Sequence, residues 1–385
     1  MTPAAVPAVP TLRIGPLAVS PPVVLAPMAG VTNAPFRRLC RSFGTATGLY
    51  VSEMITARGL AERNEKTLRM ARFADDEPVR SIQLYGTDPR AMAEAVRLLV
   101  DTEGADHVDL NFGCPVAKVT RKGGGAALPV RRALFAAVVR AAVGAAGAVP
   151  VTVKMRIGVD DTLPTFLDAG QVAADEGVAA VALHARTARQ HYSGRADWSA
   201  IAELRAKLPA AVPVLGNGDI WRPTDALAMV AATGCDGVVV GRGCLGRPWM
   251  FRDIAVAMAG GTPPPPPPLG EVATVLGRHA RLLAGWKPEP LALVDLRKHV
   301  SWYLHGYPVG GDVRRRLMAA TTLAELDGVL ATLDPDVRPL PGSEAEPRGK
   351  TSGPQRKVAL PVGWLDAPDD PTPLVADDVA ALSGG

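Results

Sequence analysis

The sequence predicts an α/β fold, a (β/α)8 TIM barrel followed by a small C-terminal helical domain. Short apolar, β-rich runs recur about every 25–40 residues between residues 20 and 255, and amphipathic stretches of helical period separate them. Several of these runs are almost wholly apolar, as in parallel strands covered on both faces. Eight such units are the number that closes a barrel.

The expected elements follow from these runs. We expect the eight barrel strands at residues 23–28, 49–53, 79–84, 107–111, 151–154, 179–184, 212–217 and 237–241. Helices are expected between them, for example over residues 90–100, 131–142 and 225–232. Residues 12–19, with Gly15 and Pro16 in the middle, predict a hairpin ahead of the barrel.

A proline run marks the end of the barrel. Residues 263–268 are all proline, which favours a stiff polyproline II spacer. The pattern then becomes helical, and after Asp334 the chain is rich in Pro, Gly and charge, which indicates disorder. The short apolar piece at residues 358–365 could still dock on another part of the protein. We therefore expect an N-terminal segment at 1–22, the barrel at 23–255, a linker at 256–269, a helical domain at 270–335 and a disordered tail at 336–385.

Composition narrows the class of protein. The 385 residues are 48% hydrophobic and 21% charged, as in an ordinary globular protein, and the net charge of +4 permits an anionic partner without requiring one. The four cysteines lie far apart without zinc-binding spacing, which predicts free thiols, a cytoplasmic location and no metal. Neither a signal peptide nor a membrane span is expected, because the apolar stretch 134–149 is interrupted by Arg140.

The strand ends carry the functional signal, because the active site of such a barrel lies at its C-terminal mouth. Taken singly, Cys114 could be a small buried hydrophobe, Lys154 a surface lysine and His184 a core histidine. Polar or glycine-rich ends on all eight strands favour a common site instead. These ends carry Pro27, Met28, Ala29 and Gly30; Glu53; Gln83; Asn111 and Cys114; Lys154 and Arg156; His184 and Arg186; Asn217, Gly218 and Asp219; and Gly241, Arg242 and Gly243.

Two glycine-rich turns, residues 216–218 and 241–243, end the last two strands. Turns at this place expose backbone N–H groups and commonly hold a phosphate, although glycines also simply permit tight turns. With Arg242 beside them and Lys154 in the centre, they predict a phosphorylated cofactor lying across the barrel mouth. No GxGxxG follows the first strand, so a Rossmann unit is not indicated.

Together these motifs resemble the tRNA-dihydrouridine synthase family, most closely its bacterial B-type branch. The resemblance covers about residues 12–330 in the matching order and includes Arg297-Lys298-His299 in the helical region. The matching motifs are residues 26–33 (APMAGVTN), 52–54 (SEM), 83–86 (QLYG), 111–115 (NFGCP), 153–156 (VKMR), 184–187 (HART), 216–220 (GNGDI) and 241–243 (GRG).

The resemblance implies an FMN enzyme that reduces a uridine in the D-loop of tRNA to 5,6-dihydrouridine, with NADPH, or else NADH, as reductant. Cys114 would be the catalytic acid that gives a proton to C5 after hydride from the flavin reaches C6. The residues implied to bind the flavin are Pro27, Met28, Ala29, Gln83, Lys154, His184, Asn217, Gly218, Asp219, Gly241 and Arg242.

Contacts with tRNA are expected from residues near the mouth and in the helical domain, although basic clusters are also common on solvated faces. The candidates are Asn111, Lys118, Arg186, Arg297 and Lys298. The glycine run at 123–125 predicts a loop that closes over the substrate. No membrane and no protein partner is indicated.

Two other functions stay open. An FMN barrel acting on a free pyrimidine, like dihydroorotate dehydrogenase, would share the flavin residues, but a small substrate needs no second basic domain. A non-catalytic RNA-binding protein on a degenerate barrel is disfavoured by the presence of Cys114, Lys154 and His184.

Overall fold

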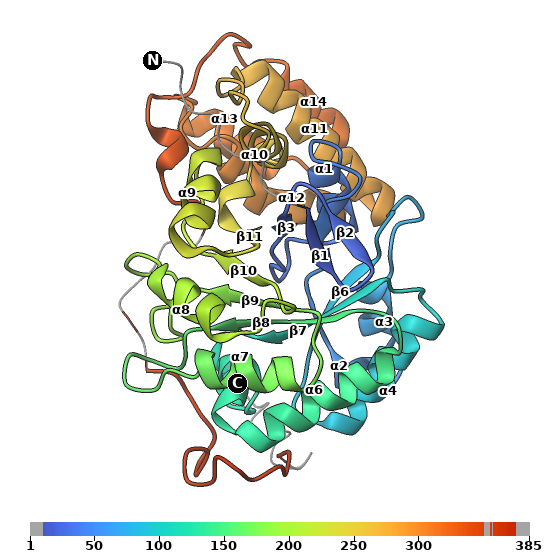
Figure 1. Ribbon diagram of the computed structural model, residues 1–385. Coiled ribbons are helices and arrows are strands. Elements are labelled where there is room, and N and C mark those ends of the chain that lie inside the picture. Colours follow the sequence, from blue (N-terminus) through green and yellow to red (C-terminus); the bar gives the residue numbers. More distant parts are fainter. Residues whose placement is uncertain (1–10, 350–354, 356, 375–385) are drawn as a thin grey trace, which may run out of the picture.

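The computed structural model describes residues 11–349, 355 and 357–374. Figure 1 shows the parallel sheet and its surrounding helices in the lower part of the molecule and a group of helices above it. The α/β barrel with a C-terminal helical region is therefore confirmed.

The barrel sheet has nine parallel strands, and its two outermost strands are pieces of one segment. In spatial order they are β4 (Leu49–Tyr50), β3 (Val23–Leu25), β11 (Gly237–Val240), β10 (Val214–Asn217), β9 (Ala180–His184), β8 (Val151–Arg156), β7 (His107–Phe112), β6 (Ser81–Tyr85) and β5 (Met54–Thr56). Between β4 and β5, the N–H of Ser52 donates to Ser81 O (3.1 Å), and Ser52 Oγ accepts from Gln83 N (3.1 Å). The second expected strand, residues 49–53, is thus interrupted after Tyr50, and Ser52 in the interruption bonds β6 and so closes the barrel.

Amphipathic helices surround the strands. On α6, for example, Leu134, Val138 and Ala142 recur at a spacing of four and are all buried, so one face packs on the sheet. The helices of the barrel are α1 (Ala34–Arg41), α2 (Ala57–Ala61), α3 (Glu65–Ala71), α4 (Pro89–Asp101), α5 (Ala117–Thr120), α6 (Arg132–Ala146), α7 (Phe166–Asp175), α8 (Ser199–Lys207), α9 (Pro223–Thr233) and α10 (Met250–Met258), with 3-10 turns η1 (Gly125–Val130) and η2 (Arg242–Cys244).

The expected hairpin is present as β1 (Leu12–Ile14) and β2 (Leu17–Val19). Gly15 turns the chain at a φ of +55°, in the left-handed region that glycine tolerates best. The side chains of Leu12 and Ile14 join a buried cluster with strand residues such as Leu215. The hairpin therefore covers one end of the barrel interior and leaves the opposite mouth for the site.

The helical domain consists of α11 (Leu269–Trp286), α12 (Glu289–Tyr303), α13 (Gly311–Ala319) and α14 (Leu323–Leu330). It packs on the barrel through α1, where the Phe36 ring lies 5.6 Å from the ring of His279 and 5.5 Å from that of His299. The expected domain boundary at residues 255/256 falls inside α10, because Ile254 and Met258 both belong to the barrel core. The helix stays continuous to bury both side chains.

The described part of the tail packs first on the helical domain and then on the barrel, which differs from the disorder that its composition indicates. Ser343 in η3 (Ser343–Ala345), Arg348 and Trp364 are only 4%, 4% and 1% exposed. In Figure 1 the described pieces of this segment, in red, lie beside the helical domain and at the opposite end of the barrel. A few well-placed anchors hold the chain here, and an average over composition does not detect them.

Within the described residues, no helix combines the length and the apolar character needed to cross a membrane. The same part of the chain contains no group of three or more His, Cys, Asp or Glu side chains placed to hold a metal ion.

Candidate active site

A cleft of about 540 Å³ lies at the C-terminal mouth of the barrel, where β3, β8, β9, β10 and β11 end. Nine of the eleven expected flavin residues line it, namely Pro27, Met28, Lys154, His184, Asn217, Gly218, Asp219, Gly241 and Arg242. Of the other two, Ala29 is exposed just beyond the cleft, and Gln83 lies below it with 1% exposure. Parallel strands explain this gathering, because their carboxyl ends meet at one rim.

Lys154 is the cation in the centre of the cleft. Its Nζ donates to Asn217 Oδ1 at 2.9 Å, and Asn217 is itself held by a 2.7 Å bond from Nδ2 to Val239 O. Burial, and then the neighbouring charge of Arg156, lower the pKa of Lys154 to about 8. The amine is therefore mostly protonated at neutral pH.

Three arginines, Arg156, Arg186 and Arg242, add positive charge around the same cleft, and this charge acts on the pKa of His184. Burial lowers the pKa of His184 well below its ordinary value, and Arg156, Lys154, Arg186 and Arg242 lower it further. The imidazole is therefore neutral at physiological pH. Such an excess of cations is suited to an anionic ligand.

Asp219 contacts two of these arginines, Arg186 and Arg242, through its carboxylate. Its backbone has a φ of +54°, and its carboxylate accepts from Arg186 Nη2 at 2.7 Å and from Ala196 N at 2.7 Å. Arg242 Nη2 lies 3.8 Å from the same carboxylate. The Asp219 side chain thus holds cations in place, and a phosphate would meet the cations and not this carboxylate.

Arg186 is buried rather than displayed to a macromolecule. It is 2% exposed and donates to Ser193 O and Gly194 O as well as to Asp219. This position does not suit the tRNA contact that we expected of it. Among the described residues, its Nη1 has no hydrogen-bond partner, so one buried donor near the glycine-rich turns is left for a ligand.

Arg242 lies between two aromatic rings. Its guanidinium carbon is 4.3 Å from the ring centroid of Tyr192 and 4.9 Å from that of Trp221. Both rings line the cleft and restrict the guanidinium through cation–π contact. Sequence reasoning missed both residues, although Trp221 directly follows the Gly-Asn-Gly-Asp-Ile motif and could have been found there.

The loop with Cys114 begins directly after β7. Asn111 Oδ1 accepts from the backbone N–H groups of Gly113 (3.1 Å) and Cys114 (2.9 Å), and Arg156 Nε donates to Gly113 O at 2.8 Å. Cys114 is half-buried, and burial raises the pKa of its thiol, although Val116 N–H and Arg156 favour the thiolate. The thiol is therefore the neutral-pH form, which can give a proton but is a poor nucleophile.

A buried relay continues from Asn111 into the barrel interior. Asn111 Nδ2 donates to Gln83 Oε1 (2.8 Å), and Gln83 Nε2 donates to Asp109 Oδ2 (2.6 Å). Thr152 Oγ1 donates to the other oxygen of Asp109 (2.6 Å). Burial raises the pKa of Asp109 to about 6, so its carboxylate is mostly ionised at pH 7 and orients both donors. Sequence reasoning missed Asp109 and Thr152 because they lie inside strands and not at the strand ends, from which the candidates were taken.

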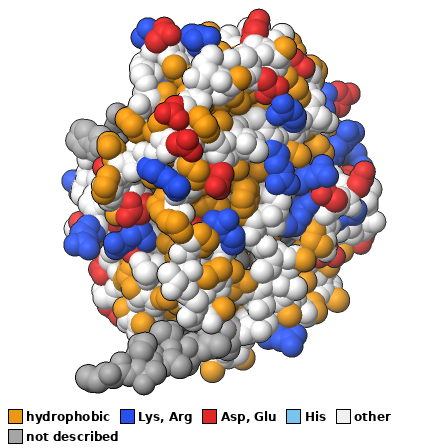
Figure 2. All heavy atoms as spheres, turned by 90° about the horizontal axis from the view of Figure 1, so that it is seen from above, with side chains coloured by type: hydrophobic (Ala, Val, Ile, Leu, Met, Phe, Trp, Pro, Cys, Tyr) orange, Lys and Arg blue, Asp and Glu red, His pale blue; other side chains and the backbone are white. Residues whose placement is uncertain are grey.

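Of the remaining tRNA candidates, Lys118 is exposed on α5, in the loop that carries Cys114. Lys298 on α12 lies over the barrel mouth, since a Cβ atom at Gly30 would be 3.8 Å from its Nζ. Arg297 is half-buried, and its Nε has no hydrogen-bond partner within the described chain. Figure 2, which looks onto the end that carries the helical domain, shows several Lys and Arg side chains gathered on one side among acidic and apolar ones.

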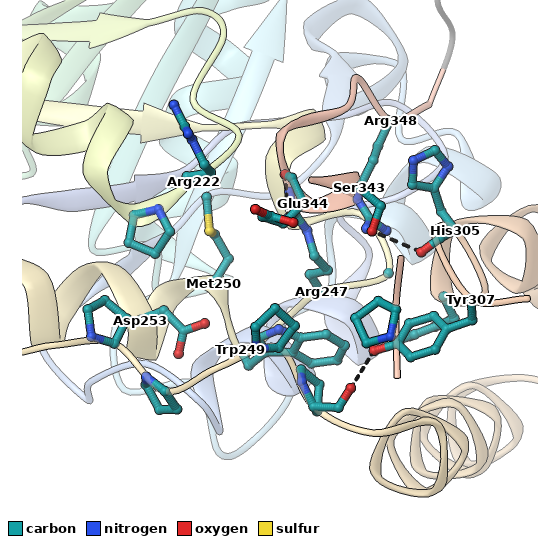
Figure 3. A pocket seen from close by; sticks show the side chains of 18 of the residues that line it. Arg222, Arg247, Trp249, Met250, Asp253, His305, Tyr307, Ser343, Glu344 and Arg348 are labelled. Atoms are coloured by element: carbon teal, nitrogen blue, oxygen red, sulfur yellow. Dashed lines mark hydrogen bonds between the residues drawn. The ribbon is translucent and has the colours of Figure 1, made fainter. Parts of the chain in front are cut away.

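A second cavity, of about 920 Å³, lies where the barrel, the proline run, the helical domain and the tail meet (Figure 3). One arginine of its wall, Arg247, serves the structure. It donates to Trp221 O (2.8 Å), Gly243 O (2.9 Å) and Glu344 O (2.8 Å), which ties the glycine-rich turn at 241–243 to the tail. The proline run is held here too, by the bond from Tyr307 Oη to Pro267 O (2.6 Å) drawn in Figure 3. This cavity shares no lining residue with the cleft at the strand ends and does not include Cys114, so it is not the candidate active site.

Comparisons with known proteins identify the family of the chain. The sequence profile of the family described as Dihydrouridine synthase (Dus) matches residues 24–337. A probable tRNA-dihydrouridine synthase of Mycobacterium tuberculosis is 54% identical over 368 residues, which cover 94% of each chain. A tRNA-dihydrouridine synthase B of Xanthomonas axonopodis pv. citri is 40% identical over 312 residues, 81% of this chain and 92% of that one.

Solved structures agree on the fold. Histamine dehydrogenase from Rhizobium sp. 4-9 aligns with a TM-score of 0.51 at 14% identity, over 84% of this chain and 63% of that one. TcOYE with pHBA aligns with a TM-score of 0.51 at 10% identity, over 67% and 94%. With a family profile over most of the barrel and the helical domain, and relatives at 40–54% identity, the chain belongs to the dihydrouridine synthase family.

Proposed function

We propose that this enzyme reduces one uridine in the D-loop of tRNA to 5,6-dihydrouridine, in the cytoplasm, with bound FMN and with NADPH as reductant. The observation that carries the proposal is a half-buried, protonated thiol, Cys114, held beside a cleft lined with cations. The relatives from Mycobacterium tuberculosis and Xanthomonas axonopodis are named as tRNA-dihydrouridine synthases, which supports the reaction and the substrate class.

The residues of the cleft fit FMN. Its phosphate would lie at the turns formed by Gly218 and Gly241, beside Arg242 and the unpartnered Nη1 of Arg186. Lys154 and the neutral His184 would contact the ring, with Pro27 and Met28 against its surface. When bound and reduced, this cofactor supplies the hydride that C6 of the uracil receives.

Lys154 has two roles in this scheme. Its ammonium would stabilise negative charge on the reduced ring, and its bond to Asn217 fixes the place where that charge is offset. Because its pKa is about 8, the ammonium is present at neutral pH and is lost in mild alkali.

Cys114 completes the reduction by giving its proton to C5. A general acid must be protonated at the working pH, and burial keeps the pKa of this thiol above its ordinary value. Asn111 and Arg156 hold the loop by its backbone, through Cys114 N and Gly113 O, so they position the sulfur without using it.

The tRNA would approach over the helical domain and the Cys114 loop. Lys118 and Lys298 are placed to meet its phosphates on either side of the mouth, with Arg297 next to Lys298. The uridine must leave its stack to reach the cleft, which a flexible loop of tRNA permits more easily than a helix.

The test is dihydrouridine mapping in tRNA from cells with and without the gene, followed by assays of the purified protein. We expect loss of the modification at one D-loop position, a yellow protein that NADPH reduces faster than NADH does, and a Cys114→Ala variant that still oxidises NADPH but forms no dihydrouridine. An unchanged modification pattern, with reduced flavin that free pyrimidines reoxidise instead, would refute the proposal.

A further inference from the structure

The C-terminal tail makes a buried contact with the back of the loop that carries Cys114. Trp364, 1% exposed, lies against Gly123, where any Cβ atom would overlap the indole. Gly123 also has a φ of +72°, so both the space and the backbone favour glycine. The indole Nε1 donates to Ala127 O at 2.9 Å. The glycine run that we expected to close over the substrate is therefore packed against the tail at Gly123.

Charged groups secure the same contact. The Arg131 guanidinium lies 4.7 Å from the indole ring centroid, its Nε donates to Trp364 O (3.0 Å), and its Nη1 pairs with Asp370 (2.7 Å). Next to it, Arg132 pairs with Asp369 at 3.2 Å. The indole is thus enclosed by an arginine and by the chain on both sides of η1, which is a specific docking rather than incidental burial.

A short path of contacts connects Trp364 with Cys114. Ala126 N donates to Cys114 O at 3.0 Å, and Ala126 is the residue before the one that accepts the indole bond. A Cβ atom at Gly125 would be 2.5 Å from the same Cys114 oxygen, so the two backbone segments touch. Residues 123–127 therefore contact both Trp364 of the tail and the backbone of Cys114.

This contact lies outside the part of the chain that the family shares. The family profile ends at residue 337, and the synthase B relative from Xanthomonas aligns over 312 residues that already make up 92% of its length. The Mycobacterium tuberculosis relative aligns over 368 residues. The tail is therefore an addition to the common enzyme, and it is placed on the loop with the catalytic thiol.

We propose that Trp364 is a positioning residue, which holds residues 114–130 in the arrangement that presents the Cys114 thiol to the substrate base. The role of the thiol rests on the proposed function, while the ordering of the loop does not. Without the indole, the glycine run gains freedom and Cys114 samples positions from which its proton does not reach C5. Flavin reduction does not involve this loop and continues.

The experiment compares Trp364→Ala, Trp364→Phe and, as matched control, Leu365→Ala, whose side chain is 52% exposed and adjacent in sequence. Amide hydrogen exchange over residues 114–130 and the rate of Cys114 alkylation by iodoacetamide report loop order without any turnover. The other three cysteines, Cys40, Cys235 and Cys244, are buried, so peptide mass spectrometry isolates the Cys114 signal.

We expect Trp364→Ala to raise both rates about tenfold or more, and Leu365→Ala to leave them unchanged. Trp364→Phe, which keeps an aromatic ring but loses the bond to Ala127 O, should be intermediate. In single turnovers, Trp364→Ala should slow uridine reduction about tenfold with NADPH-dependent flavin reduction altered less than about twofold.

Wild-type exchange and alkylation rates in Trp364→Ala would overturn the proposal, as would equal losses in both half-reactions. If Trp364→Ala does not fold, Asp370→Asn removes only the ion pair to Arg131, and the same rates should rise by a smaller factor. If the wild type forms no dihydrouridine, the proposed function fails while the exchange and alkylation results still decide whether the tail orders the loop.

Discussion

Exchanging the side chains of Asp109 and Asn111, which both bond Gln83, tests whether this buried hydrogen-bond relay positions Cys114. In the wild type, Asp109 accepts from Gln83 Nε2, which leaves Gln83 Oε1 to accept from Asn111 Nδ2. Because Asn111 Nδ2 faces Gln83, its Oδ1 faces the N–H groups of Gly113 and Cys114. A carboxylate deep in the barrel therefore sets the orientation of an amide at the rim.

The single change Asn111→Asp breaks this order. It keeps an acceptor for the two N–H groups but places a carboxylate oxygen against Gln83 Oε1, and Asp109 prevents Gln83 from turning round. One hydrogen bond of about 1 kcal/mol is lost, and a buried acceptor without a donor costs about 1–3 kcal/mol more. If this total cost of about 2–4 kcal/mol destabilises only the loop arrangement in which Cys114 reacts, uridine reduction slows by roughly 30- to 800-fold.

The double change Asp109→Asn with Asn111→Asp restores a complete relay in reverse. The new amide at position 109 donates to Gln83 Oε1 and still accepts from Thr152, and Gln83 Nε2 donates to the new carboxylate at position 111. Asp109→Asn alone should be mild, because its oxygen can face Gln83 while its amide nitrogen donates to Thr152, whose hydroxyl then turns to His107 (2.9 Å away). The double variant should recover most of the lost rate, with a coupling of about 2 kcal/mol.

The assay is single-turnover dihydrouridine formation by pre-reduced enzyme, with urea unfolding of all four proteins as the measure of stability. Flavin reduction by NADPH is measured beside it, because Gln83, an expected flavin contact, keeps its orientation in Asn111→Asp and reverses it in the double variant. Equal loss in Asn111→Asp and in the double variant would refute the reasoning, since the rate would then depend on the identity of residue 111 and not on the direction of the relay.

Four further outcomes are expected. Because burial raises the pKa of the Cys114 thiol, uridine reduction should be constant through neutral pH and fall only in alkali, and a fall centred below pH 7 would contradict this assignment. FMN affinity, measured by fluorescence quenching, should weaken about tenfold between pH 7 and pH 9 as Lys154 loses its proton, and it should be independent of pH in Lys154→Gln. Arg242→Ala should weaken binding of FMN by about 10- to 100-fold and that of riboflavin, which lacks the phosphate, far less. Lys298→Ala should reduce the slope of log affinity for tRNA against log salt by about 0.7–0.9, with flavin content unchanged.

The sequence alone predicts the barrel and most of its mouth for one physical reason. Parallel strands bring their carboxyl ends to one rim, so residues as distant as Met28 and Arg242 meet without any knowledge of loop structure. The hairpin and the helical domain follow equally from local patterns. The expected continuous strand at 49–53 was wrong, because Ser52 turns to bond both Ser81 and Gln83 and interrupts the run.

Contacts that depend on tertiary approach could not be predicted in this way. Asp109 alternates with apolar residues along β7, and only its neighbours in space make it the start of a relay. The sequence shows Arg186 only as a basic residue at a strand end, but its guanidinium is buried and donates to Asp219 and to two loop carbonyls. Trp364 belongs to the apolar piece 358–365, which the sequence allows to dock, but its place on Gly123 and Arg131 exists only once those residues are folded.

The pKa values around the cleft connect its charge with its function. Burial, together with neighbouring cations, lowers the pKa of Lys154 to about 8 and those of Arg156 and Arg242 to about 10. Since each unit corresponds to about 1.4 kcal/mol of disfavoured charge, the folded protein carries several kcal/mol of unfavourable electrostatic energy here. An anionic ligand among these cations offsets that energy, so FMN binding and resistance to unfolding should rise together. Two of these cations, Lys154 and Arg156, lie on a barrel strand, whose buried core supplies the stability that gathering them requires.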